Sequence, residues 1–171
     1  MGAVAPERGG DVARPTKYAT PICAAATVIA AIGLLLSLLT KQPLWAIILL
    51  IPAAAYEAYR TEGESTRWAS WALLVLLVAS VALIVFGVSF DLATFFGAEE
   101  RYVGGQVVPL GDIKVVAPTL MGICAVILFT RTRGKYTRWL AAVIFIASAG
   151  IVYTISPEAV ADLLGIALDG L

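Results

Sequence analysis

Long apolar segments alternate with short polar connections along most of the chain. A helix of about 17–25 apolar residues is needed to cross about 30 Å of hydrocarbon. Segments of that length follow one another at 21–40, 43–59, 67–90, 113–130 and 139–155. The pattern predicts an all-α integral membrane protein with five transmembrane helices, which together form a domain over residues 21–155.

The second apolar segment is the least regular of the five. Pro52 interrupts it, which removes one backbone hydrogen bond and should kink the helix. Only Lys41 and Gln42 separate it from the first segment before Pro43 begins it. Two arrangements fit this tight connection: two full crossings of the bilayer, or a re-entrant hairpin formed by the first two segments.

The composition agrees with a lipid environment and excludes several function classes. Hydrophobic residues make up 60% of the 171 residues and charged residues 14%, against roughly 45–50% and 25% in soluble domains. The twelve basic residues balance twelve acidic ones, so no net charge attracts nucleic acid, and we expect no such partner. Histidine is absent and Cys23 and Cys124 lie far apart in sequence, so we expect no metal and no cofactor.

The distribution of positive charge predicts the orientation. Nine of the twelve basic residues fall on one side of the predicted helices: Arg8, Arg14, Lys17, Arg60, Arg67, Arg131, Arg133, Lys135 and Arg138. The other side carries only Lys41, Arg101 and Lys114. Because Lys and Arg concentrate in cytoplasmic connections, we expect a cytoplasmic N-terminal tail over residues 1–20 and a C-terminus outside. The lack of Asn and abundance of Ala, Gly, Val and Arg favour a prokaryotic plasma membrane.

Two elements are expected on the outer side. The connection over residues 91–112 is the only long one, and within it short strand-like stretches flank Gly104 and Gly105, which predicts a small hairpin. Residues 156–171 begin with Ser156-Pro157 and place apolar and acidic residues on opposite faces. This pattern predicts an outer amphipathic helix at the C-terminus.

Small side chains form a stripe on the first predicted helix. They recur at spacings of three and four residues: Cys23, Ala26, Ala30, Gly33 and Ser37. Such a stripe lets another helix approach closely, because little side-chain volume separates the backbones. The sequence is compatible with a partner helix in the same chain and with one in another subunit.

Glu57 is the only acidic residue within a predicted span, which makes it a candidate functional residue. It lies about one turn from the inner end of its helix and three residues before Arg60. The simpler interpretation is that its carboxylate reaches the interface or pairs with Arg60. The alternative is a cation or proton transport site at a subunit boundary.

Four cations gather between the last two predicted helices, in a segment that we expect to be an inner loop. They are Arg131, Arg133, Lys135 and Arg138. They contribute to orientation, and they can also attract anionic lipid headgroups by about 1 kcal/mol each.

No general base, metal site or nucleophile pair is visible, so we expect no catalytic residues and no enzymatic activity. The features favour a non-catalytic accessory or structural subunit of a membrane assembly or homo-oligomer. Its partners would be the lipid bilayer, anionic headgroups and other membrane subunits or copies of itself. The alternative is a small channel or transporter with a path at a protomer interface near Glu57.

Overall fold

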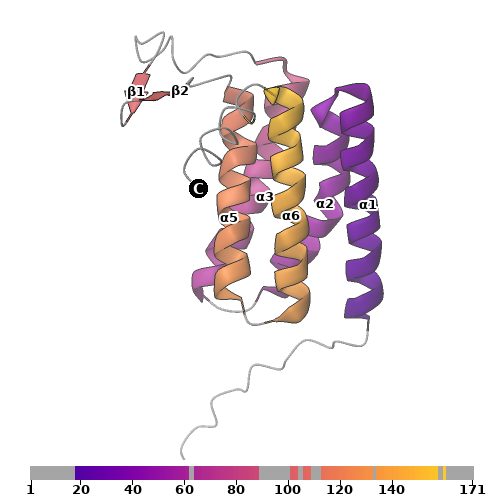
Figure 1. Cartoon of the computed structure of the whole chain (residues 1–171). Helices are drawn as coiled ribbons and strands as arrows, with labels where there is room; N and C mark the ends of the chain where they lie inside the picture. Colours follow the sequence, from indigo (N-terminus) through magenta and orange to yellow (C-terminus); the bar gives the residue numbers. More distant parts are fainter. Residues whose placement is uncertain are drawn as a thin grey trace, which may run out of the picture.

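The computed structural model describes residues 18–61, 64–88, 101–103, 106–108, 113–132, 134–157 and 160. Within them lie five helices and two strands. The helices are α1 (Ala19–Thr40), α2 (Pro43–Arg60), α3 (Glu64–Val85), α5 (Ile113–Arg131) and α6 (Lys135–Ile155). The strands are β1 (Arg101–Val103) and β2 (Gln106–Val108). The helices run alternately up and down, so that the end of each lies near the start of the next helix of the bundle (Figure 1).

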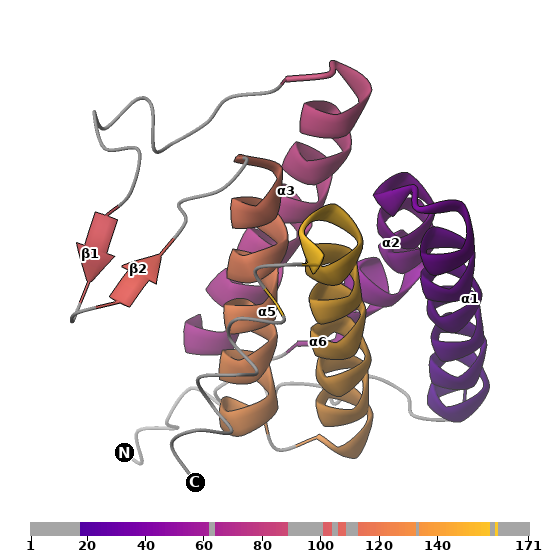
Figure 2. The same cartoon turned by 45° about the horizontal axis from the view of Figure 1, so that its top comes forward.

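The five helices form a bundle in which α2 and α6 each contact three others. Helix α1 packs against α2 and α6, α2 also packs against α3 and α6, and α5 fits between α3 and α6. Figure 2 shows α5 and α6 on one side of the bundle, α3 and α2 behind them, and α1 beside α2. The larger core side chains come from four helices: Ile47, Leu50, Leu73, Leu77, Met121, Leu128, Leu140, Ile144 and Ile151. Helix α1 contributes small residues to the core instead.

Four of the helices are long and apolar enough to cross a membrane. They are α1, residues 66–85 of α3, residues 114–131 of α5, and α6. Most of their side chains face outward, and between 22% and 33% of each apolar stretch is buried in the bundle. Hydrocarbon solvates such side chains as well as a protein core does, so these faces need no cover in lipid. The chain is therefore a helical membrane protein. Helix α2 is not one of these four apolar helices.

The third helix ends earlier than its apolar pattern predicts. The expected helix over 67–90 is wrong at both ends, because α3 runs from Glu64 to Val85. At its end Gly87 adopts a φ of 62°. The Val88 N–H bonds the Leu83 oxygen at 3.1 Å, and the Gly87 N–H bonds the Ile84 oxygen at 3.2 Å. This is the Schellman arrangement that a glycine allows at a helix end.

The last helix begins earlier than predicted, at Lys135 instead of residue 139. Helix α5 ends at Arg131, so the segment expected to be an inner loop is reduced to residues 132–134. Long cationic side chains can extend away from the apolar region, and a helix can therefore continue through them. Lys135 and Arg138 accordingly lie on the first turn of α6.

The connection between α1 and α2 is as short as the sequence suggests. Lys41 adopts a left-handed conformation with φ 54°, and the Gln42 N–H bonds the Ser37 oxygen at 3.2 Å. Pro43 then begins α2, where its missing N–H costs no hydrogen bond. With 18 residues, α2 has a length of about 27 Å, which is close to the thickness of the hydrocarbon layer.

The two strands lie between α3 and α5 in sequence and pair antiparallel. The paired residues are Arg101 with Val108, Tyr102 with Val107, and Val103 with Gln106. Their side of the membrane stays a prediction. The expected tail over residues 1–20 and the expected outer helix over 156–171 fall almost entirely outside the described residues, and both stay predictions as well.

Candidate functional site

Polar side chains from three helices meet where α1 begins, α2 ends and α6 begins. The hydroxyls of Thr20 and Tyr136 lie 2.7 Å apart and join α1 to α6. Arg60 donates from Nη1 to the Tyr56 hydroxyl at 3.3 Å, and its guanidinium carbon lies 5.2 Å from the centre of the Tyr136 ring. We call these four residues the polar rim. Within it, the Tyr56 hydroxyl and the face of the Tyr136 ring contact the Arg60 guanidinium.

Glu57 lies inside the bundle, about one turn before Arg60 of this rim. Its side chain is 0% exposed, and its Oε2 has no hydrogen-bond partner. The Thr61 hydroxyl oxygen lies 2.7 Å from the Glu57 backbone oxygen and 3.3 Å from Oε1, so one hydroxyl proton serves both. The carboxyl group thus neither reaches the interface nor forms a close ion pair with Arg60, contrary to the simpler interpretation of the sequence.

The inward direction of Glu57 follows from its place on α2. The buried face of this helix consists of Ala46, Ile47, Leu50, Ala53, Ala54 and Glu57. Glu57 lies seven residues after Leu50 and three after Ala54, so it continues the same face by helical spacing. That spacing is present in the sequence. It could have predicted the burial, had the covered face of α2 been known.

A buried carboxyl group with one unpartnered oxygen has limited chemical options. Burial of an unpaired negative charge is costly, so a proton or a cation must offset it. Cys23 of α1 is buried within electrostatic range of both Glu57 and Arg60. Among the described residues, no three His, Cys, Asp or Glu side chains are close enough together to hold a metal ion.

The small-residue stripe of α1 faces the interior of its own chain. All five members are buried: Cys23, Ala26, Ala30, Gly33 and Ser37. A Cβ added to Gly33 would lie 2.6 Å from the Cβ of Leu49 and 3.0 Å from the Trp45 oxygen, so α2 approaches closely there. Ser37 donates to the Thr154 hydroxyl of α6 at 3.4 Å. The stripe thus serves contacts within the chain.

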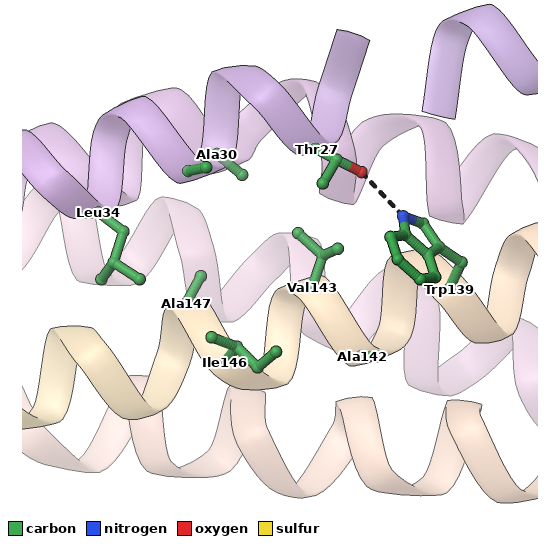
Figure 3. Close-up of a pocket in the computed structure, with 9 residues that line it drawn as sticks. Thr27, Ala30, Leu34, Trp139, Ala142, Val143, Ile146 and Ala147 are labelled. Carbon is green, nitrogen blue, oxygen red and sulfur yellow. Dashed lines mark hydrogen bonds between the residues drawn. The ribbon is translucent and has the colours of Figure 1, made fainter. Parts of the chain in front are cut away.

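A groove of about 270 Å³ runs between α1 and α6 on the outside of the bundle (Figure 3). Its walls are mostly small or aliphatic: Thr27, Ala30, Ala31, Leu34, Trp139, Ala142, Val143, Ile146 and Ala147. The Trp139 Nε1–H donates to the Thr27 hydroxyl at 3.0 Å and bridges the two helices at one end. We call this the α1–α6 groove.

A second groove, of about 290 Å³, lies between α5 and α6. It is lined by Ala125, Val126, Phe129, Ala141, Ala142, Phe145 and Ile146. Ala142 and Ile146 line both grooves and so separate them. The Arg138 guanidinium carbon lies 4.9 Å from the centre of the Phe129 ring, which places a cation at the end of this α5–α6 groove.

The structure brings three of the four predicted cations to one end of the bundle. Arg131 is the last residue of α5, Lys135 is the first of α6, and Arg138 follows within the first turn; all three are exposed. Arg133 lies outside the described residues. Sequence reasoning found the cations but missed both grooves, because a groove depends on which helices are neighbours.

No family model, no curated protein and no solved structure matches this chain.

Proposed function

We propose that this chain is a non-catalytic subunit of a membrane assembly or homo-oligomer, with a helix of another subunit seated in its α1–α6 groove. The observation that carries this proposal is the groove itself, whose walls include Ala30, Ala31, Ala142 and Ala147. Helices associate in lipid where small residues let their backbones approach, since the hydrophobic effect does not drive them together. The stripe of α1 packs mainly within the chain, whereas Ala31 and Ile146 are exposed in this groove and can contact a second helix.

We further propose five crossings, with the N-terminus in the cytoplasm. The lengths of α1 and α2, 22 and 18 residues, support full crossings over a re-entrant hairpin, because each is long enough to cross the hydrocarbon layer. Tyr18, Arg60, Arg67, Arg131 and Lys135 lie at one end of the alternating helices, whereas Lys41 and Lys114 lie at the other. An excess of cations at that first end is typical of a cytoplasmic interface, whereas aromatic residues occur at both interfaces.

The subunit proposal is tested by filling the groove. Ala31→Leu adds volume to the wall contributed by α1 without changing the charge of the chain. We expect the wild-type protein to elute from mild detergent with stoichiometric partners or copies of itself, and the variant to lose them. Ala72→Leu is the matched control, because Ala72 is exposed on α3 and is absent from both groove linings.

Two results would contradict the proposal. One is recovery of the wild-type chain as a lone monomer in several mild detergents. The other is an Ala31→Leu variant that keeps its partners as completely as Ala72→Leu does. Light scattering on the eluted complex measures the mass of the protein component in both cases.

A second candidate function is proton or cation transport, favoured by the unpartnered Oε2 of Glu57. Because Glu57 faces the interior of its own chain, the path would run inside one bundle and not at a protomer interface as the sequence suggested. Glu57→Gln keeps the shape of the side chain but removes its titratable group. We expect it to abolish proton or monovalent cation flux in reconstituted vesicles, and an unchanged flux would reject this candidate.

A further inference from the structure

We propose that the α5–α6 groove binds one anionic phospholipid, with an acyl chain along the groove and the phosphate at Arg138. This site is independent of the subunit proposal, which concerns the other groove. The two grooves have similar volumes, about 290 and 270 Å³, but within the described part of the chain only the α5–α6 groove has a guanidinium over the ring of one of its lining residues. Because the two volumes are similar, the grooves differ mainly in whether a guanidinium lies at one end.

The position of Arg138 is fixed by Phe129. Their guanidinium-to-ring distance of 4.9 Å is within the range of a cation–π contact, and Phe129 is itself part of the groove wall. A guanidinium held over a ring retains N–H donors that point away from that ring. A planar fork of this kind suits the paired oxygens of a phosphate. The cation is therefore held at the place where a lipid in the groove would present its headgroup.

The charge of the two helices that line the groove favours an anion. Arg131 ends α5 and Lys135 begins α6, so both flank the same end of the groove as Arg138. Neither helix contains an acidic residue, and these cations meet no opposing carboxylate on their own helices. Each cation near the membrane surface adds about 1 kcal/mol of attraction for anionic lipid.

The walls of the groove select a lipid over a soluble phosphate compound. All seven lining residues are apolar, and Phe129 and Phe145 supply two aromatic rings. Val126 and Phe145 are about half exposed, so the groove is open along the outer surface of α5 and α6. An acyl chain can fill such a channel from the surrounding bilayer, whereas a free phosphate would contact only the cations.

The test measures lipid retained by the full-length protein. We would purify it from vesicles that contain equal amounts of phosphatidylglycerol and phosphatidylcholine with identical acyl chains, and quantify both lipids by native mass spectrometry. The wild-type protein should retain phosphatidylglycerol in preference to phosphatidylcholine. Arg138→Gln should lower this preference about fivefold, as expected for the loss of one cation at the surface.

Two further variants separate the headgroup contact from the groove. Phe129→Leu keeps the cation and an apolar wall but removes the ring that positions Arg138, and it should lower the preference as well. Val126→Trp fills the groove and should reduce retention of any bound lipid, whereas Val75→Trp on the exposed face of α3 is its matched control. Arg67→Gln, an exposed cation on α3, controls for the general loss of positive charge.

Several outcomes would overturn the proposal. One is an Arg138→Gln variant that folds normally, judged by helical circular dichroism and elution, and keeps the wild-type preference. Another is a Val126→Trp variant with unchanged retention, which would mean that the cations attract lipid without the groove. Displacement of the bound lipid by millimolar inorganic phosphate would indicate a phosphate site and not a lipid site. If Arg138→Gln does not fold, Phe129→Leu decides the headgroup contact alone.

Discussion

In helices α2 and α3 the relation between hydropathy and burial is the reverse of what a soluble protein would show. Helix α3 is among the four most apolar helices and yet faces outward, with Trp68 81% exposed and Val75 64% exposed. Helix α2 is not among those four, and yet it contacts α1, α3 and α6 and buries Leu50 and Glu57 completely. In lipid, apolar character marks the surface that touches hydrocarbon. A polar group is tolerated where other helices cover it.

The largest effect should come from a cavity in the α2 core. Leu50→Ala removes a fully buried side chain, whereas Val75→Ala on α3 removes one that faces outward. We expect Leu50→Ala to lower the free energy of unfolding in mixed micelles by about 2 kcal/mol, the low end for such substitutions, because transfer into hydrocarbon costs little. Val75→Ala should change it by less than about 0.5 kcal/mol. Equal losses for both would show that α2 is no more enclosed than α3.

The next effect tests the close approach of α2 to α1. A Cβ at Gly33 would come within 2.6 Å of the Leu49 Cβ, so Gly33→Ala forces the helices apart and should cost about 1.5 kcal/mol in the same unfolding assay. Gly122→Ala is the control, since its nearest side-chain atoms are 3.9 Å away, and it should be neutral. A neutral Gly33→Ala would contradict the tight α1–α2 contact.

A smaller effect of opposite sign is expected at Glu57. Replacing it with methionine removes a buried oxygen that has no partner and keeps an apolar chain of similar length. Glu57→Met should therefore raise the free energy of unfolding by about 1 kcal/mol. A loss of stability would mean that the carboxyl group has a stabilising partner, such as a bound cation. The unfolding assay repeated with and without added monovalent cation distinguishes the two cases.

The smallest effect concerns the bridge across the α1–α6 groove. Thr27→Val removes the acceptor of the Trp139 indole hydrogen bond and should cost about 0.6 kcal/mol, a typical value for such bonds between membrane helices. The matched control is Thr130→Val, whose hydroxyl bonds only carbonyl oxygens of its own helix. If both variants unfold alike, the indole contact adds nothing to the α1–α6 packing.

Much of the fold could be predicted because hydrocarbon thickness fixes helix length. The apolar runs located all five helices, and helical spacing located the buried stripe of α1 from Cys23 to Ser37. The end of α3 was missed because apolar residues continue to Phe90, although Gly87 carried the signal for termination. The start of α6 differs from the prediction because Lys135 and Arg138, whose charges favour a loop, lie on the helix itself.

The candidate sites were harder to predict because they depend on which helices are neighbours. The inward position of Glu57 requires α1, α3 and α6 to cover α2, and no local pattern specifies that. The contact between Arg138 and Phe129 joins two helices across a sharp turn, and the sequence indicated only that both residues are near it. The grooves likewise arise from packing.

The central proposal is that α2 crosses the bilayer as one helix of a five-helix bundle, with Leu50 and Glu57 on its buried face. Its most direct test is the labelling of single cysteines on intact cells with an impermeant thiol reagent, in a chain with Cys23 and Cys124 replaced by alanine. Lys41→Cys, before α2, should react, and Arg67→Cys, after it, should react only once the membrane is opened. A Lys41→Cys variant that stays unreactive on intact cells would contradict the crossing, because the tip of a re-entrant α1–α2 pair lies within the bilayer; reaction of both variants from the same side would contradict it as well.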